Sequence, residues 1–235
     1  MVCKKFQPNW DSSRPRVYDT WDNNGRTWVI QDLAPEDDEE ALDILMEHLV
    51  PDEAICIASD LSNDPVSLEE FKQIWRKMLS ERMSLGVYTT VGGEKTLVAL
   101  NACHVAYADG EKEVLEVKGM ASQNAFKAVD YIKKVSNGVK HLGLDKALSA
   151  LGLVVKREYR GDKLGARILA AREPLCLSHG LEGTETLFTG PASQKLAERC
   201  GFQTIREISF DELADAGLKF PRNGTILKYM MKKYK

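Results

Sequence analysis

The features that this sequence lacks exclude several classes of protein. Its 235 residues contain five cysteines, an odd number, and no two of them form a CxxC pair. The four histidines are scattered too, so the sequence predicts neither a disulfide framework nor a bound metal. No apolar run approaches the roughly 20 residues that span a bilayer, and no apolar region follows the first lysines as in a secretory signal. We therefore expect a cytoplasmic protein with reduced thiols and no membrane partner.

An excess of basic charge is also missing. Lysine and arginine total 32 against 35 acidic residues, which leaves a formal net charge of -3. Because a protein that binds nucleic acid needs a basic surface for the phosphates, nucleic acid is not an expected partner. Mild acidity fits a cationic substrate only weakly, since many proteins with neutral ligands are mildly acidic. The remaining composition, 43% hydrophobic and 29% charged, is typical of a globular domain.

Two cysteines have a histidine nearby in the sequence. Cys103 and His104 are neighbours in a predicted strand, where adjacent side chains point to opposite faces. Cys176 and His179 are three residues apart near a predicted helix end, so their side chains could meet. A structural cysteine beside a surface histidine is the simpler interpretation of each pair, and the sequence gives little support to a thiol nucleophile.

The chain divides into a short polar start and one long domain. Residues 1–25 are rich in turn formers, among them Pro8, Pro15 and the run from Asn23 to Gly25, and predict an arm laid on the domain. Residues 26–235 show no internal repeat and no low-complexity segment. We expect them to form a single domain.

Apolar residues beyond the arm alternate between strand and helix spacing. The order of the predicted elements indicates an α/β (α+β) fold with a mixed central sheet flanked by helices, and no parallel doubly wound repeat. Pro174 is expected to kink or break its helix. Strands are predicted at 26–30, 86–90, 96–104, 148–155, 185–189, 202–208 and 225–231, and helices at 35–49, 66–82, 122–140, 163–179 and 192–200.

The most informative segment joins the strand at 148–155 to the helix that follows it. The first turn of a helix presents free N–H groups and the positive end of the dipole, and so takes an anion. Gly161 and Gly165 remove side chains where a ligand must approach the backbone, and Arg160 and Lys163 add positive charge. The alternative is an ordinary β–turn–α junction with solvated basic residues. The segment matches neither the P-loop pattern nor GxGxxG, which disfavours a nucleotide hydrolase and a dinucleotide fold.

Residues 159–166, with the sequence YRGDKLGA, resemble the acetyl-CoA pyrophosphate loop of the GNAT superfamily of N-acetyltransferases. The pattern of that loop is Arg or Gln, two residues, Gly, one residue, then Gly or Ala. Arg160 and Gly165 match it, and Lys163 stands where the first glycine is usual. Because we expect that position to be helical already, a lysine is sterically possible there and could itself reach a phosphate.

A second stretch extends the resemblance. Residues 187–202 are similar to the strand–helix segment that closes such folds and ends in a "GF" pair, here Gly201 and Phe202. At motif level, the chain resembles the insect-type arylalkylamine N-acetyltransferases over roughly residues 27–233.

This resemblance implies how acetyl-CoA binds. The ligand is expected in a splayed cleft between the strands at 148–155 and 185–189, with its amide arm paired to the first of these like an added strand. The residues implied to hold the amide arm and then the pyrophosphate are Leu153, Val154, Val155, Arg160, Gly161, Asp162, Lys163, Leu164, Gly165 and Ala166.

The resemblance also implies catalytic residues. The substrate ammonium must lose a proton, the neutral amine must attack the thioester, and a thiolate must leave. Glu53 matches the glutamate of a "DE" pair that acts as the base, although a surface or helix-capping carboxylate is the alternative. Thr189 and Ser193 match two hydroxyl residues near the sulfur, with threonine where serine is usual, and Ser193 could instead simply cap its helix. Residues 190–202 contain no tyrosine, the general acid of many superfamily members.

The function implied is direct transfer of an acetyl group from acetyl-CoA to the primary amine of a small arylalkylamine such as dopamine, serotonin or tryptamine, by a monomer. The alternatives are a polyamine, a histamine-like or hydrazine-like amine, a protein N-terminus, or a CoA-binding protein without turnover. Some aromatic and methionine residues are candidates for an amine-binding wall, although most are expected to be structural: Trp10, Trp21, Trp28, Phe71, Trp75, Met78 and Met83.

Overall fold

One mixed sheet of eight strands forms the centre of the computed structural model, which describes residues 6–110 and 116–234. The strand order is β1-β2-β3-β4-β5-β6-β8-β7, and only β5 and β6 run parallel to each other. This is the mixed sheet that the sequence predicts. The strands are β1 (Val17–Asn23), β2 (Arg26–Asp32), β3 (Leu85–Val91), β4 (Glu94–Tyr107), β5 (Lys146–Val155), β6 (Gly183–Phe188), β7 (Gln203–Ser209) and β8 (Ile226–Lys233).

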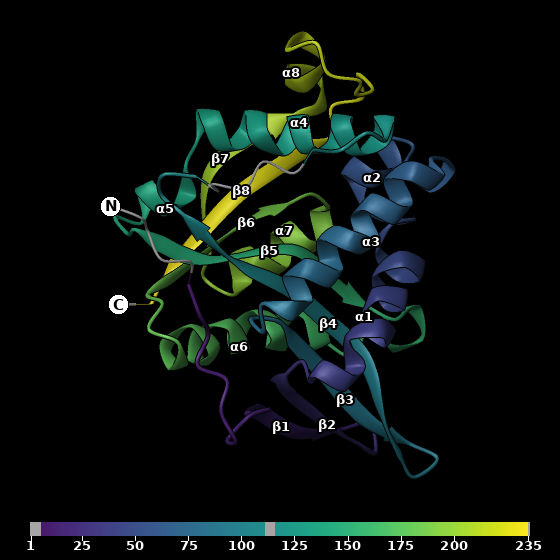
Figure 1. Cartoon of the computed structure of the whole chain (residues 1–235), viewed down its shortest axis with the longest axis vertical. Coiled ribbons are helices and arrows are strands. Elements are labelled where there is room, and N and C mark those ends of the chain that lie inside the picture. The colour runs from purple at the N-terminus through teal and green to yellow at the C-terminus, as the bar shows by residue number, and fades with distance from the viewer. Residues whose placement is uncertain (1–5, 111–115, 235) are drawn as a thin grey trace.

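Helices cover both faces of the sheet (Figure 1). One face packs against α1, α3 and α4 around the buried Phe71 and Trp75, and the opposite face packs against α6 around Trp28 and Leu164. The helical elements are η1 (Pro35–Asp37), α1 (Asp38–Ile44), η2 (Leu45–Leu49), α2 (Ala54–Ala58), η3 (Leu61–Asn63), α3 (Pro65–Ser80), α4 (Met120–Val135), α5 (Gly138–His141), η4 (Arg157–Tyr159), α6 (Leu164–Ser178), α7 (Pro191–Arg199) and α8 (Phe210–Asp215).

Part of the predicted arm belongs to the sheet. Residues 17–23 form the edge strand β1, which pairs with β2 up to the pair Asn23–Arg26. The connecting residues Asn24 and Gly25 have φ angles of 52° and 72°. This two-residue Asn-Gly turn is the one that joins hairpin strands most readily. Residues 17–23 of the predicted arm are therefore a strand of the sheet rather than an arm laid on the domain.

The helix predicted at 122–140 is two helices. Helix α4 ends at Val135, and the Asn137 side chain accepts a hydrogen bond of 3.0 Å from the Lys140 N–H and so caps α5. A Cβ on Gly138 would lie 2.9 Å from the Tyr229 hydroxyl, so a close approach to the sheet sets this break. The short helices α2 and α8 were not predicted, because five or six residues are too few to show a helical period.

Helix α6 continues through Pro174 to Ser178, so the predicted break there is wrong. Proline removes one N–H donor, which leaves a single carbonyl a turn earlier without its helical partner. Leu175 and Cys176, directly after the proline, are fully buried, and their packing against the sheet holds the last turn of the helix in place.

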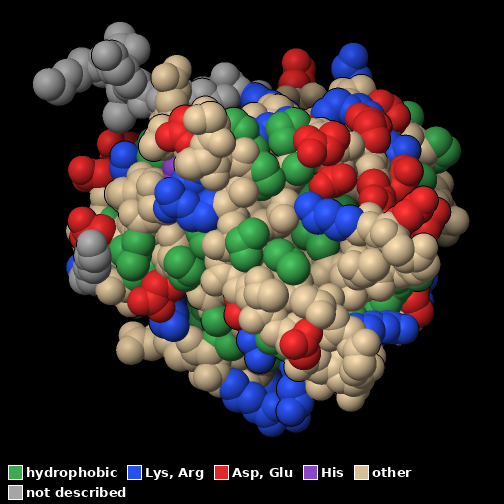
Figure 2. Space-filling model, turned by 90° about the horizontal axis from the view of Figure 1, so that it is seen from below, with side chains coloured by type: hydrophobic (Ala, Val, Ile, Leu, Met, Phe, Trp, Pro, Cys, Tyr) green, Lys and Arg blue, Asp and Glu red, His purple; other side chains and the backbone are tan. Residues whose placement is uncertain are grey.

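Charged side chains of both signs share the surface. On the face that Figure 2 shows, Lys and Arg are interspersed with Asp and Glu, in keeping with the small net charge. Across the described part of the chain, none of the helices is both long and apolar enough to cross a membrane.

A buried polar network ties the segment before β1 to the domain. Arg14 forms an ion pair of 2.7 Å with Asp32, and both side chains are almost inaccessible to solvent. The Tyr18 hydroxyl donates to the same carboxylate at 2.7 Å, and burial followed by this contact raises the pKa of Tyr18 to about 12. At the end of α6, His179 Nδ1 accepts a hydrogen bond of 3.2 Å from the Asn9 N–H.

We predict that His179 makes the fold sensitive to acid. Burial, and then the Arg14 charge, lower the pKa of His179 to about 4, from an ordinary value near 6.5. Between these values the unfolded chain takes up a proton that the folded state excludes, so stability falls as the pH drops from about 6.5 to about 4. The midpoint of thermal unfolding should therefore fall less over this range in His179→Gln than in the wild type. Parallel curves for the two proteins would contradict the prediction.

Candidate active site

A large cavity brings together nearly all the residues that the sequence singled out. Its volume is about 2610 Å³, and residues from both faces of the sheet line it. Of the predicted site residues, only Asp162 is outside the lining; those within it are Glu53, Thr189, Ser193, Leu153, Val154, Val155, Arg160, Gly161, Lys163, Leu164, Gly165 and Ala166.

A fork between two strands forms the centre of this cavity. Strand β5 pairs with β4 over its whole length but meets β6 at one position of the described chain, Leu148 opposite Thr184. Beyond that point the two strands diverge. The edge of β5 at Leu153 to Val155 therefore has no strand beside it on the β6 side. The main-chain groups that face this side are available to an extended ligand, apart from the Val155 carbonyl, which accepts a hydrogen bond from Arg160. The predicted splayed cleft is present.

The phosphate-type loop follows directly from the end of β5. The turn η4 leads to Gly161, whose φ of 101° suits glycine and around which an added Cβ would meet no described atom within 4 Å. At the start of α6 the N–H groups of Leu164 and Gly165 have no carbonyl one turn before them, whereas the Ala166 N–H donates to the Lys163 carbonyl at 3.2 Å. Open space beside these donors is what an anionic ligand requires.

Lys163 departs from expectation. It is not helical but left-handed, with φ 61° and ψ 19°, and it directly precedes α6. This conformation costs a residue with a side chain about 1–2 kcal/mol, which explains why glycine is usual at this position of the resembling loop. The expectation that Lys163 is already part of the helix is therefore wrong.

Two other residues of the loop, Gly165 and Asp162, contact neighbouring parts of the protein. A Cβ on Gly165 would lie 2.9 Å from the Leu196 side chain, so this glycine lets α6 approach α7 closely. The Asp162 carboxylate accepts a hydrogen bond of 3.0 Å from the Asn24 side chain at the β1–β2 turn. Asp162 thus anchors the loop to the hairpin.

Arg160 links the loop to the segment that carries Glu53. Its guanidinium lies 2.8 Å from the Asp52 carboxylate and donates to the main-chain carbonyls of Val155 and His48, each at 3.1 Å. Arg157 contacts the same carboxylate at 3.1 Å. Hydrogen bonds from Arg160 and then Arg157 hold the pKa of Asp52 below its ordinary value. The positive charge predicted beside the loop is therefore partly neutralised by the residue next to Glu53.

Glu53 has one engaged and one unengaged carboxylate oxygen. Oε2 accepts a hydrogen bond of 2.7 Å from the Cys56 N–H and so caps α2. Oε1 is buried and has no hydrogen-bond partner among the described residues. The capping role considered as the alternative is real, but it uses only half of the carboxylate and leaves the other oxygen beside the cavity that Glu53 lines.

The two candidate hydroxyl residues lie where β6 ends and α7 begins. Thr189 directly follows the last residue of β6 and is half-buried. Ser193 donates a hydrogen bond of 2.9 Å to the Gly190 carbonyl at the N-terminus of α7. Both line the cavity, so the local role of Ser193 does not remove it from the site.

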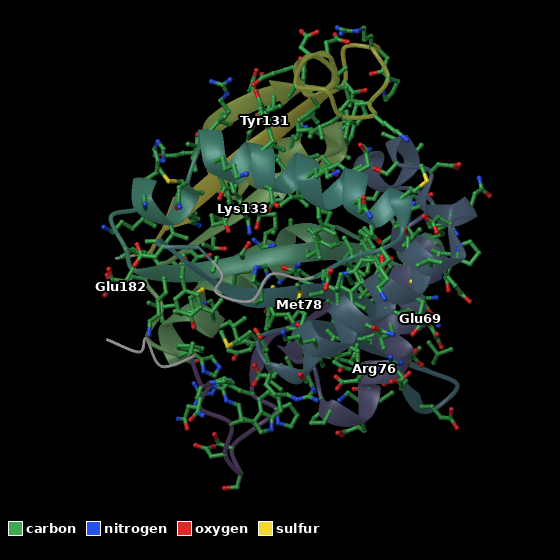
Figure 3. All side chains as sticks on the ribbon, turned by 45° about the horizontal axis from the view of Figure 1, so that its top comes forward. Glu69, Arg76, Met78, Tyr131, Lys133 and Glu182 are labelled. Carbon is green, nitrogen blue, oxygen red and sulfur yellow. The ribbon has the colours of Figure 1, made fainter. Side chains whose placement is uncertain are left out.

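Aromatic side chains from α3 and α4 line the other part of the cavity. Phe71 lies 5.3 Å from Trp75 and 5.2 Å from Phe126, measured between ring centroids. Met78 on α3 and Lys133 on α4 come from the two helices that flank this part of the cavity (Figure 3). The Trp75 indole N–H also donates to the Leu151 carbonyl of β5 at 2.6 Å, which fixes the ring over the strand.

The sequence distinguished only in part between the aromatic and methionine residues that line the cavity and those that do not. Phe71, Trp75, Met78 and Met83 line the cavity, whereas Trp21 and Trp28 stack on each other in the β1–β2 hairpin. Phe126 and Tyr229 also line the cavity but were not singled out. Phe126 belongs to an apolar helical stripe and Tyr229 to an ordinary strand pattern, so neither carries a local signal of a site.

The described cysteines are poorly suited to covalent chemistry. Burial raises the pKa of Cys103 to about 11 and raises the pKa of Cys56 and Cys176 further still. Burial also raises the pKa of Cys200. Because the thiolate is the reactive form of cysteine, these four thiols are weak nucleophiles. Cys3 lies outside the described residues.

Lys163→Gly is predicted to stabilise the protein. Glycine relieves the left-handed strain, and after its own entropic cost about 1 kcal/mol of unfolding free energy should be gained. Lys163→Ala is the matched control, because alanine removes the charge but keeps the strain. Urea unfolding of the three proteins measures the difference. Equal stabilities for the glycine and alanine variants would show that no strain is stored at this position.

Solved structures provide the comparison with known proteins, since no protein-family model matches the chain and no curated protein sequence matches it. The chain is similar to a protein of the yellow fever mosquito Aedes aegypti that carries the name arylalkylamine N-acetyltransferase 7, with 29% identity and a TM-score of 0.89. That match covers 98% of this chain and 100% of the other.

Two more distant structures share the fold. Arylalkylamine N-acetyltransferase 2 of Aedes aegypti has 18% identity and a TM-score of 0.75, over 91% of this chain and 100% of its own. A polyamine N-acetyltransferase of Drosophila melanogaster, which forms N-acetylagmatine, has 14% identity and a TM-score of 0.65, over 88% of this chain and 99% of its own.

The fold and the comparison agree with the motifs of the sequence. The eight-stranded mixed sheet, the β5–β6 fork and the loop at 159–166 are the features expected from the resemblance. The chain therefore has the fold of the GNAT superfamily of N-acetyltransferases and is similar to insect proteins named arylalkylamine N-acetyltransferase.

Proposed function

We propose that this protein transfers the acetyl group of acetyl-CoA to the primary amine of a small arylalkylamine. The observation that carries the proposal is the continuity of one cavity: it joins a strand fork and a helix N-terminus to an aromatic-walled region with a carboxylate beside it. A CoA-type ligand and an amine can therefore meet inside the protein.

The residues around the fork fit acetyl-CoA. The free edge of β5 at Leu153 to Val155 suits the amide groups of the pantetheine arm, because main-chain N–H and C=O groups pair with amides as a strand does. Gly161 and the N–H groups of Leu164 and Gly165 suit the pyrophosphate, since they combine open space with donors that lie before the first helical hydrogen bonds of α6. Arg160 and Lys163 add charge at this end of the cavity.

Glu53 is the proposed base. Its Oε1 is unpartnered beside the cavity, while the bond from Oε2 to the Cys56 N–H fixes the direction of the carboxylate. A carboxylate held in this way can take the proton of the substrate ammonium, directly or through a water molecule. The same negative charge attracts the cationic amine before the proton is transferred.

Thr189 and Ser193 are proposed to serve the leaving group. Both line the cavity at the end of β6, on the other side of the fork from Leu153 to Val155. A hydroxyl there can donate to the departing thiolate. The raised pKa values of the described cysteines argue against a covalent acyl-enzyme, so the transfer is direct.

The aromatic walls support an aromatic acceptor. Phe71, Trp75 and Phe126 form a connected set of rings that lines the same cavity as Glu53, and an aryl ring packs against such a set through edge and face contacts. Dopamine, serotonin and tryptamine combine an aryl ring with a primary amine at a short distance. The proposal therefore places the ring among these side chains and the amine towards the fork.

An acceptor panel tests the proposed function. Purified protein is mixed with acetyl-CoA and dopamine, tryptamine, spermidine, histamine or a peptide with a free N-terminus, and thiol release is followed. The expected result is a kcat/KM for the aromatic amines at least tenfold above that for the others. Faster turnover of spermidine or the peptide would change the acceptor class. CoA binding in calorimetry without thiol release for any amine would indicate a binding protein without turnover.

Glu53→Gln should lower kcat by about 10²-fold or more, because glutamine keeps a carbonyl oxygen for the Cys56 N–H but cannot accept the ammonium proton. The KM for acetyl-CoA should change little. Glu47→Gln, an exposed position on η2, is the matched control and should behave as the wild type. Wild-type turnover in Glu53→Gln across the pH range would exclude Glu53 as the base.

Arg160→Ala should weaken CoA binding about tenfold or more, the loss expected when a charged donor to phosphate is removed. Arg157→Ala is the control, since Arg157 shares the ion pair with Asp52 but does not line the cavity. Titration calorimetry with CoA compares the two variants. Equal dissociation constants of CoA for Arg160→Ala and Arg157→Ala would show that Arg160 acts only through its ion pair with Asp52.

A further inference from the structure

A buried arginine lies behind the strand fork. Arg172 on α6 is fully inaccessible to solvent. Its Nε donates to the Asn101 side-chain oxygen of β4 at 2.8 Å, and its Nη1 donates to the Thr186 hydroxyl of β6 at 2.8 Å. One guanidinium therefore joins the two strands on either side of β5. Because β5 and β6 share a single pair of residues, this side chain is a second link across the fork.

The link continues into the backbone of β5. The Asn101 side-chain N–H donates to the Gly152 carbonyl at 2.6 Å. The β4–β5 register shifts directly after Asn101, and Gly152 has a φ of 139° that favours glycine. The next residue is Leu153, where the free edge of β5 begins. Arg172 thus acts, through Asn101, on the stretch of main chain that faces the cleft.

The positive charge of Arg172 is not neutralised by a nearby acid. Among residues 6–110 and 116–234, no carboxylate lies within ion-pair distance of it, and its Nη2 is buried without a hydrogen-bond partner. The Phe202 ring, whose centroid lies 5.8 Å from Cζ of Arg172, offers some favourable contact. Burying a cation without a carboxylate is still costly, so such a group persists where something offsets the cost. The charge acts on thiols in this region: it opposes the effect of burial, which raises the pKa of Cys103.

We propose that Arg172 is a positioning residue for acyl transfer, which holds the β5–β6 fork in shape through Asn101 and Thr186. Its charge, which no carboxylate neutralises, stabilises the thiolate that leaves there. In the step concerned, the amine, which has already given its ammonium proton to Glu53, bonds through nitrogen to the acyl carbon. The C–S bond then breaks with its electron pair going to sulfur, and the second proton of the nitrogen passes to that sulfur through the hydroxyl of Thr189 or Ser193. The inference rests on the proposed function and adds to it a residue that acts through its neighbours and its charge.

Three variants and a control test this inference. Arg172→Met removes the charge and the links to both strands. Arg172→Lys keeps the charge but not the geometry of the guanidinium. Thr186→Val removes the shorter of the two hydrogen bonds to β6 and leaves the one to Thr184, at 3.4 Å. Arg167→Met on the same helix is the control, because Arg167 pairs with Asp19 on the outside of the protein. Circular dichroism selects the variants that fold. Each is compared for kcat, the KM for acetyl-CoA and the pKa of the bound CoA thiol, followed by thiolate absorbance of the enzyme–CoA complex.

The charge of Arg172 and its hydrogen bonds across the fork predict different results. Arg172→Met should raise the pKa of the bound CoA thiol by about one unit and lower kcat at least tenfold. Arg172→Lys and Thr186→Val should leave that pKa nearly unchanged but lower kcat or weaken CoA binding several-fold, since the fork is then held less firmly. The control should match the wild type.

A folded Arg172→Met protein with wild-type thiol pKa and kcat would overturn the inference. If Arg172→Met does not fold, Arg172→Lys and Thr186→Val provide the test. The inference would then be overturned if both of these variants had the kcat and the CoA affinity of the wild type. Failure of the proposed function would look different, because the wild-type protein itself would then bind no CoA or turn over no amine.

Discussion

The single residue pair between β5 and β6 is the constraint on which the site depends. Parallel strands normally continue side by side, but here the pairing ends at Leu148 and Thr184, and the strands then separate. Strand β5 stays ordered beyond that point because β4 pairs with it as far as Val155. The fold thus opens a main-chain edge inside the protein while one side of the strand keeps its hydrogen bonds. The chain then enters α6 at Leu164, which places the proposed phosphate site next to that edge.

Contacts distant in sequence link the two ends of the cavity. Asp52 precedes Glu53 in the sequence and pairs with Arg160 of the loop before α6, so the segment with the proposed base is held against the segment with the proposed phosphate site. On the opposite side of the loop, Asn24 of the β1–β2 turn donates to Asp162. The loop is therefore braced from two directions by parts of the chain more than 100 residues away.

Several departures from ordinary folding rules occur around this cavity. Lys163 is left-handed, Glu53 has a buried oxygen without a partner, and Arg172 is a buried cation without a carboxylate. Each costs free energy that the two large apolar clusters on either side of the sheet must offset. Unfavourable groups of this kind persist chiefly where function requires them, which makes their concentration at one cavity informative.

Local patterns of the sequence predicted much of the fold and the chemical parts of the site. Alternating apolar residues predicted most strands, and the strand–glycine–helix order at 148–179 predicted the proposed phosphate site, because the donors of such a site belong to the local backbone. Glu53, Thr189 and Ser193 came from the resemblance alone and remain proposed catalytic residues. The tertiary structure decided which aromatic residues line the cavity, that residues 17–23 join the sheet, and that Arg172 spans the fork. These features depend on contacts between residues far apart in the chain, and no local period or motif records them.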